Sequence, residues 1–331
     1  MQTPTFVPRP PSLASRLALA GARVTLRPLE HLIPDNELGI AVTRRVLAGL
    51  VALGSTTARD VEVEEVDLRD ARHGRIKGEW NRPTGARSDG VVLYIHGSGY
   101  NLCSTRTHRP LVTRLAKASN LAVFSTEYRL APKHVFPTAA EDVERAYEWL
   151  LDEGWRPDQV LVAGDSAGGH LTLDVALVQL RAGRELPAGL VMLSPLADPS
   201  CTLMLERELI APDPMISAAG VQRLLAHYLA GADPKHPRLT HVLAEDEVLP
   251  PTLIQAGGAE FLAGDAHHLH DMLAATGTPV TLEVWPGQMH VFQAGPRAFP
   301  EAEPALRRAA RFLVQALEAR AAIVHGREVT A

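Results

Sequence analysis

Four short apolar runs in the middle of the chain constrain its fold more than any other feature. Each run is four or five residues long, is rich in β-branched or aliphatic side chains, and lacks polar alternation. Strands that are buried on both faces have this composition, and they occur in parallel sheets covered by helices. The runs cover residues 91–95, 121–124, 160–163 and 190–193. They predict an α/β fold with a mostly parallel, twisted sheet of about eight strands flanked by helices.

The segments on either side of these runs extend the pattern. Weaker strand candidates lie at residues 61–63, 76–80, 252–256 and 280–284. Between strands, residues 141–151 place apolar side chains on one helical stripe, and Gly154 ends that helix. A last helix follows Pro304, and four of its side chains are expected to face the core: Leu306, Ala310, Leu313 and Leu317.

Two regions interrupt this rhythm of strands and helices. Residues 1–60 read as helical and irregular, and residues 199–246 contain five prolines around one clear helix. The second region would lie between two strands of the sheet. An insertion of this size at such a place predicts a lid over the active-site face.

Composition excludes several classes of protein. The chain has a net charge of −5 and no basic surplus to hold a phosphate backbone, so no nucleic-acid partner is expected. Cys103 and Cys201 form neither a disulfide framework nor a metal-binding spacing. We find no signal peptide and no apolar run long enough to span a membrane. We therefore expect a cytoplasmic protein with no membrane partner.

The strongest chemical signal follows the run at 160–163, where the sequence reads Gly164-Asp165-Ser166-Ala167-Gly168 and an apolar segment comes next. A strand, a G-x-S-x-G turn and a helix make a nucleophile elbow. The turn is so sharp that side chains at the two glycines would clash. It would expose the Ser166 hydroxyl at a helix N-terminus, where the helix dipole favours developing negative charge. Ser166 is thus the candidate nucleophile.

A second signal, His96-Gly97-Ser98-Gly99, follows the run at 91–95. Attack on a carbonyl group generates an oxyanion, which preorganised N–H donors stabilise by about 2.7–4 kcal/mol each. A loop of small residues lets the backbone approach that oxygen closely. We predict an oxyanion hole formed by the backbone amides of Ser98, Gly99 and Ala167.

The third signal is His290, in a loop that follows the last predicted strand. A loop in this place reaches across the carboxyl ends of the sheet. His290 also comes after Ser166, as the chain order serine, acid, histidine of this fold requires. It is the candidate general base.

These motifs resemble the hormone-sensitive-lipase family of α/β hydrolases, in the branch called bacterial family IV esterases. The resemblance covers about residues 80–315. The elbow matches without change, and the loop at 96–99 differs from the family's H-G-G-G only by Ser98. Further matches lie at Glu127-Tyr128-Arg129-Leu130-Ala131-Pro132, Phe136-Pro137, Glu141-Asp142 and Pro250-Pro251-Thr252-Leu253.

The resemblance implies a domain organisation and a function. The family's cap combines an N-terminal segment with an insertion after the sixth core strand. This implies residues 1–60 as the N-terminal part of the cap, 61–198 and 247–331 as the catalytic core, and 199–246 as the cap insertion. The implied reaction is serine-dependent hydrolysis of a small ester with a short acyl chain. No metal or organic cofactor is implied, and a homodimer is compatible with the family.

The acid of the triad is less sharply indicated. The family's loop begins a D-x-L-x-D pattern, and Glu260 occupies its first position here. Asp265 lies one residue beyond the place of the second acid, where a helix is expected to begin. A carboxylate is needed to orient the histidine and stabilise its imidazolium form. We predict Glu260 as this acid, with Asp265 as the alternative.

Other residues near these motifs are expected to support the site. His96 and Gly97 belong to the oxyanion loop, and Asp165 is expected to organise the elbow through backbone hydrogen bonds. Tyr128 and Arg129 are expected to brace the loop or the core. The role of Asp198 is left open between support of the site and a loop turn.

Two other functions fit the same sequence. The machinery that cleaves esters also cleaves amides or peptides, and nothing in the chain excludes such substrates. A catalytically silent small-molecule receptor on this fold is a second alternative. Such receptors typically lose the base, whereas this chain has His290. The cluster His267, His268 and His270 is interpreted as a solvated helix face rather than a metal site.

Overall fold

The computed structural model describes residue 6 and residues 8–29, 36–97 and 99–330. Within these ranges one eight-stranded sheet runs in the order β1-β2-β4-β3-β5-β6-β7-β8. The β1/β2 and β2/β4 pairs are antiparallel, and all other pairs are parallel. The strands are β1 (Val61–Asp70), β2 (Gly74–Pro83), β3 (Arg87–Ile95), β4 (Leu121–Thr126), β5 (Val160–Asp165), β6 (Gly189–Leu193), β7 (Thr252–Gly257) and β8 (Val280–Trp285).

The predicted fold class is confirmed. The four apolar runs lie within β3, β4, β5 and β6, where no side chain of a run is more than 8% exposed. Each weaker candidate also lies in a strand. Alternate side chains of β3 enter two different cores, because Val91 and Leu93 pack on one face of the sheet and Val92 and Tyr94 on the other.

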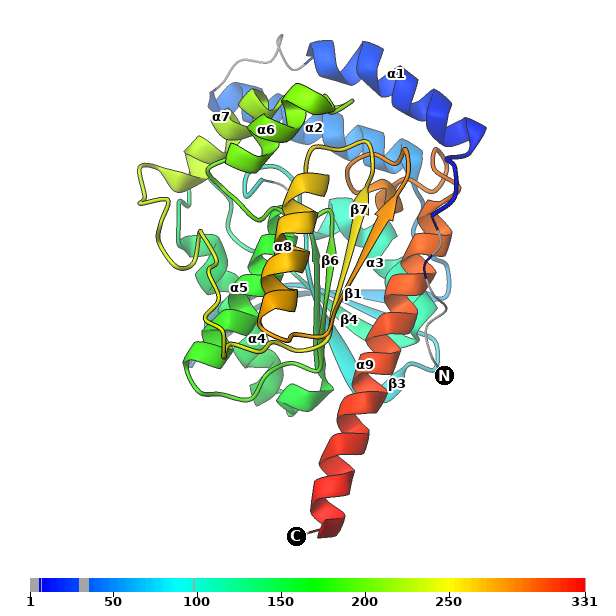
Figure 1. The fold of residues 1–331 in the computed structure, drawn as a ribbon. Helices are drawn as coiled ribbons and strands as arrows, with labels where there is room; N and C mark the ends of the chain where they lie inside the picture. The colour runs from blue at the N-terminus through cyan, green and yellow to red at the C-terminus, as the bar shows by residue number, and fades with distance from the viewer. Residues whose placement is uncertain (1–5, 7, 30–35, 98, 331) are drawn as a thin grey trace.

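Helices cover both faces of this sheet (Figure 1). The core of one face contains apolar side chains of α3 and α9, and the core of the other face contains those of α4, α5 and α8. The helices are α1 (Leu13–Leu29), α2 (Glu37–Gly54), α3 (Thr105–Ser119), α4 (Thr138–Asp152), α5 (Ala167–Arg181), α6 (Thr202–Ile210), α7 (Ala218–Leu229), α8 (Ala263–Ala275) and α9 (Ala302–Thr330), with 3-10 turns η2 (Pro157–Gln159) and η3 (Phe292–Ala294).

The two predicted core helices are confirmed. The segment predicted at 141–151 is α4, which extends a few residues further at its N-terminus. The last helix is α9, and its four predicted core side chains are at most 2% exposed. None of the helices in the described ranges is both long and apolar enough to cross a membrane.

Four helices, α1, α2, α6 and α7, gather at one end of the molecule, at the top of Figure 1. We call them the cap helices. The first two come from the N-terminal segment, and the other two lie between β6 and β7. Helix α2 is only partly buried, because Leu38 is 67% exposed while Ile40 is buried. The division into cap and core at residues 60, 199 and 246 stays a prediction.

Candidate active site

The local backbone places Ser166 at a sharp junction between β5 and α5. Ser166 adopts φ 53° and ψ −121°, a conformation that is unfavourable for a residue with a side chain. Its amide donates to the Leu193 carbonyl (2.9 Å), and its own carbonyl accepts from the Leu196 amide (3.1 Å). These bonds to the segment around the end of β6 hold the strained turn. The half-buried Ser166 side chain therefore projects at the N-terminus of α5.

Glycines on both sides of Ser166 make this junction possible. A Cβ atom at Gly164 would lie 2.4 Å from the carbonyl oxygen of Gly168, and one at Gly168 would lie 2.0 Å from the carbonyl oxygen of Ile95. The second contact joins the elbow to the end of β3, directly before the loop at residues 96–101. The crowding that the motif predicts is thus present, and it fixes the elbow against this loop.

The predicted oxyanion loop lies beside the elbow. Ser98 lies outside the described residues, so its predicted role is not tested. Gly99 follows with φ 56°, and a Cβ atom there would lie 2.9 Å from the Leu224 side chain of α7. Asn101 fastens the loop, because its side-chain amide donates to the carbonyls of Gly99 (2.5 Å) and Leu224 (2.9 Å).

Asp165 connects the elbow to the oxyanion loop with its side chain. The fully buried carboxylate accepts from the Tyr94 hydroxyl (2.7 Å), from His108 Nε2 (3.2 Å) and from the backbone amide of Gly97. Burial raises the pKa of Asp165, but the His108 charge and these hydrogen bonds lower it by more, so the net shift is downward. The partners of this carboxylate therefore lie on β3, α3 and the oxyanion loop.

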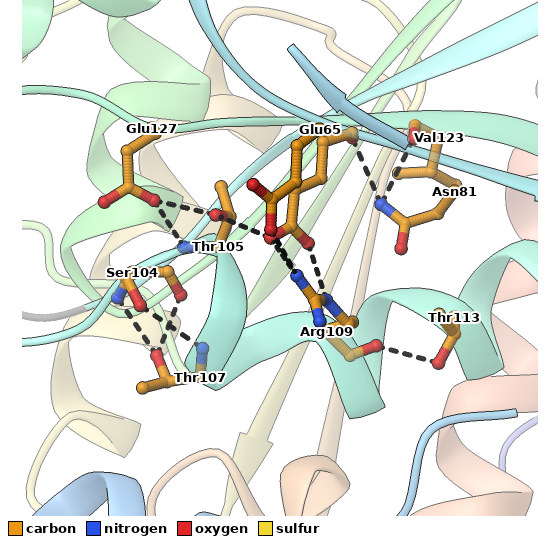
Figure 2. A network of polar contacts seen from close by, with 10 residues as sticks. Glu65, Asn81, Ser104, Thr105, Thr107, Arg109, Thr113, Val123 and Glu127 are labelled. Carbon is orange, nitrogen blue, oxygen red and sulfur yellow. Dashed lines mark hydrogen bonds and ion pairs between the residues drawn. The ribbon is translucent and has the colours of Figure 1, made fainter. Parts of the chain in front are cut away.

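The far end of the loop is anchored at the start of α3 (Figure 2). The Thr105 amide and hydroxyl both donate to Glu127 Oε2, at 2.7 and 2.8 Å, and the hydroxyl also lies 3.2 Å from Glu79 Oε1. Arg109, one helical turn further on, donates twice to the buried Glu79. Tyr128 supports the near end, because its hydroxyl donates to the His96 carbonyl and its ring stacks on the imidazole. Arg129 pairs instead with Asp142.

His290 lies against Glu260. Its Nδ1 donates to Glu260 Oε2 at 2.5 Å, and the imidazole side chain is 24% exposed whereas Glu260 is fully buried. The other carboxylate oxygen accepts from the Gly257 amide (2.6 Å) and the Ser194 hydroxyl (2.7 Å). Ser194 in turn accepts from the Val291 amide, so it ties the histidine loop to the acid. With Nδ1 occupied as a donor, Nε2 is left to act as an acceptor.

Charge around the imidazole sets its protonation. Burial lowers the pKa of His290, but the Glu260 charge and hydrogen bond, followed by the charges of Asp213 and Asp165, raise it by more. The net pKa therefore lies above the ordinary histidine value. No hydrogen bond joins His290 to the Ser166 hydroxyl in the described part of the chain. Such a bond is often long without a substrate.

Asp265, the alternative acid, points elsewhere. Its Oδ1 accepts from the backbone amides of Ala197 (2.8 Å) and Asp198 (3.2 Å). Burial raises the pKa of Asp265 to about 7. Asp198 itself caps α6, because its carboxylate accepts from the amides of Ser200 and Thr202. The structure thus brings Glu260, and not Asp265, to His290.

Sequence reasoning missed three residues that hold this site together: Ser194, Asn101 and Asp213. Ser194 directly follows a predicted strand, so its place at the edge of the sheet was a usable signal. Asn101 and Asp213 carried no such signal, since their partners lie on segments far away in the sequence. His267 and His268 are exposed on α8, as expected for a solvated face.

Known proteins resemble this chain along most of its length. Residues 92–294 match the α/β-hydrolase fold family. An acetyl-hydrolase of Streptomyces hygroscopicus is 41% identical over 242 residues, which cover 72% of this chain and 80% of the relative. A carboxylesterase/phospholipase, LipF, of Mycobacterium tuberculosis is 34% identical over 321 residues, which cover 92% of this chain and 82% of the relative.

Solved structures also resemble this chain over most of its length. An esterase from the bacterial hormone-sensitive lipase family superimposes with a TM-score of 0.82 at 32% identity, covering 92% of this chain and 99% of the other. A protein named EstE5 superimposes with a TM-score of 0.82 at 34% identity, covering 93% of this chain and 99% of the other.

Proposed function

This chain belongs to the hormone-sensitive-lipase family of α/β hydrolases and is an esterase, and we propose that it hydrolyses short-chain carboxylic esters through a serine acyl-enzyme. The contact that carries the proposal is the hydrogen bond between His290 Nδ1 and Glu260 Oε2. It is joined by the strained conformation of Ser166 at the N-terminus of α5. That arrangement fits a triad whose members come from three separate loops.

In the first step, the Ser166 oxygen attacks the ester carbonyl carbon while Nε2 of His290 takes the hydroxyl proton. Glu260 holds the imidazole in the tautomer that has a free Nε2, and its charge stabilises the imidazolium that forms. The tetrahedral intermediate collapses when the bond to the leaving alkoxide breaks, and His290 returns the proton to that oxygen. The acyl group is then bonded to Ser166.

In the second step, water replaces the alcohol. His290 takes a proton from water as the water oxygen attacks the acyl carbon, and then returns a proton to the Ser166 oxygen as that bond breaks. The carboxylic acid leaves and the enzyme is restored. Each proton that His290 accepts is given back within the same step, so no cofactor is needed for the balance.

The oxyanion of both steps is assigned to the backbone amides of Ser98, Gly99 and Ala167. Two observations support this assignment. Gly168 fixes the elbow against the end of β3, and Asn101 fixes Gly99 within the loop. Preorganised donors of this kind are worth about 2.7–4 kcal/mol each in the transition state.

Esters are better supported as substrates than amides, because the similar proteins carry the names esterase, carboxylesterase and acetyl-hydrolase. These names also favour an enzyme over a silent receptor. A homodimer stays a prediction.

Pre-steady-state hydrolysis of p-nitrophenyl acetate tests the mechanism. The full chain should release a burst of p-nitrophenol equivalent to one acyl group per active site before the steady rate. Ser166→Ala should abolish the burst and lower kcat by about 10⁴ or more. Ser217→Ala, which alters a helix-capping serine of α7, is the matched control and should keep the burst. An unchanged burst in Ser166→Ala would refute the proposed nucleophile.

A further inference from the structure

One acidic residue of the cap insertion, Asp213, contacts the loop that carries Glu260. Asp213 lies between α6 and α7, and it is 1% exposed. Its Oδ2 accepts from the backbone amide of Phe261 at 3.3 Å, and its Oδ1 accepts from the Met215 amide at 2.8 Å. Phe261 directly follows Glu260 in the chain. A single buried carboxylate therefore joins the cap insertion to the residue next to the proposed triad acid.

The backbone of Asp213 is itself held from α1. The Arg27 guanidinium donates to the Asp213 carbonyl and forms an ion pair with Glu208 of α6. The second oxygen of Glu208 accepts from the Ala218 amide at the start of α7 (2.7 Å). Contacts among three cap helices therefore hold the backbone at Asp213, and the Asp213 side chain in turn contacts the acid loop.

Asp213 also contributes charge to the proposed triad. Its carboxylate acts on His290 through space, in the same direction as Glu260 and Asp165, and raises the pKa of the imidazole. Burial raises the pKa of Asp213 itself to about 6, with a further upward effect of the Glu260 charge and a downward effect of His290. The carboxylate is therefore mostly ionised above pH 6, where His290 must work as a base.

We propose that Asp213 is a positioning residue for the Glu260–His290 pair. It holds the acid loop through the Phe261 amide, and it adds a second carboxylate charge to Glu260 where the imidazolium forms during acylation. The inference rests on the proposed function, because it assumes that His290 is the base. In this proposal, part of the negative charge that acts on the triad comes from a residue of the cap insertion rather than from the sheet.

A defined shift in pH dependence follows from this role. A variant without the Asp213 charge stabilises the imidazolium less, so the pKa of His290 falls. The base then stays neutral to lower pH, and the acidic limb of kcat/KM moves in that direction. A residue that only supported the fold would lower stability or rate without moving the limb.

The experiment measures kcat/KM for p-nitrophenyl butyrate against pH for the full chain and two charge-free variants. Asp213→Asn keeps one oxygen acceptor, for either the Met215 amide or the Phe261 amide, and Asp213→Ser keeps a hydroxyl acceptor for the turn at Met215 in case the asparagine variant does not fold. The acidic limb should move down by about half a pH unit or more in either variant. kcat should fall by about tenfold, because the imidazolium is less stabilised.

Asp233→Asn is the matched control. Asp233 lies in the same insertion, precedes a proline as Asp213 does, and accepts from the amide two residues on (Lys235, 2.9 Å), but it is solvent-exposed. This variant should leave the acidic limb where it is in the wild type.

Two results would overturn the inference. One is an acidic limb of Asp213→Asn or Asp213→Ser that coincides with the wild-type limb. The other is an equal shift in Asp233→Asn, which would show that any charge in the insertion acts the same way. Failure of the proposed function is distinguishable, because Ser166→Ala would then keep the wild-type activity whatever the Asp213 variants do.

Discussion

Glu260, in the loop after β7, and Asp265, in the first turn of α8, are two fully buried carboxyl groups with different partners. Glu260 faces His290, a hydroxyl and one backbone amide, so its charge lies against a group that can become positive. Among the described residues, Asp265 faces backbone amides of the 197–198 segment, and its second oxygen has no hydrogen-bond partner there. The burial of an acid therefore does not decide which one serves the histidine. The direction of its oxygens does.

This contrast gives a prediction for paired variants. Glu260→Gln should lower kcat by about 10⁴, because the neutral amide no longer stabilises the imidazolium and allows the wrong tautomer. Asp265→Asn should stay within about tenfold of the wild-type kcat, because the amide oxygen can still accept from Ala197 and Asp198. Steady-state hydrolysis of p-nitrophenyl acetate measures both, and thermal melts check that each variant is folded. The reverse ranking would transfer the role of acid to Asp265.

The pH dependence is a second prediction at the scale of residues. His290 must be neutral to accept the Ser166 proton, and its pKa is raised above 6.5 by the surrounding carboxylates despite burial. Because a raised pKa keeps the base protonated to higher pH, activity should be lost as pH falls through a value above 6.5. A kcat/KM profile of the wild type between pH 5 and 9 measures this limb. A limb below pH 6, or none at all, would argue against His290 as the base.

At the scale of elements, the elbow and the end of β3 are packed so closely that only glycine fits between them. Gly168→Ala would place a Cβ atom 2.0 Å from the Ile95 carbonyl, and this carbonyl directly precedes the oxyanion loop. The backbone must move, so we expect a loss in kcat of about 100-fold or more, as a displacement of about 1 Å at a reacting group can produce. Activity measured beside a thermal melt separates this effect from unfolding.

Gly49→Ala is the matched control for that variant. Gly49 lies inside α2, and a Cβ atom there meets nothing within 4 Å. Alanine is favoured over glycine in a helix interior by about 0.5–1 kcal/mol, so this variant should melt at the same or a higher temperature with unchanged kcat. If Gly168→Ala were as active as Gly49→Ala, the close contact at the elbow would have no part in catalysis.

The same scale shows what the sequence could predict. The buried strands and the elbow are local features, because consecutive residues determine each of them. The structure has each of them where the sequence predicts it. The oxyanion loop and His290 were placed by their position after a strand end. The contacts of Asp213 and Asn101 could not be predicted in this way, because they join segments about 48 and 123 residues apart that meet only in the folded chain.

At the scale of the whole molecule, the cap helices contact both loops of the site. On one side Arg44 of α2 donates to the Asn101 carbonyl, and Asn101 donates to the carbonyl of Leu224 in α7. On the other side the Asp213 carboxylate accepts from the Phe261 amide next to Glu260. The oxyanion loop and the acid loop are therefore each held from the sheet and from the cap. Cap helices with these contacts are part of the frame of the site.

The last prediction concerns the acyl group that the site accepts. Leu224 of α7 lies against Gly99, with a distance of 2.9 Å between a leucine methyl group and an ideal Cβ atom on the glycine. A leucine at that place limits the room beside the oxyanion loop, and a closed pocket must bury most of a small ligand. We therefore expect p-nitrophenyl esters with acyl chains of about two to eight carbons to be the best substrates. A chain-length series from acetate to palmitate measures kcat/KM for each, and faster turnover of emulsified long-chain triglyceride than of dissolved butyrate ester would contradict the expectation.

Leu224→Ala should move the optimum to longer chains, because it removes part of the wall. Leu209→Ala, at a cap leucine that is 88% exposed, should leave the optimum unchanged. An identical chain-length profile for wild type and Leu224→Ala would show that α7 does not set the limit.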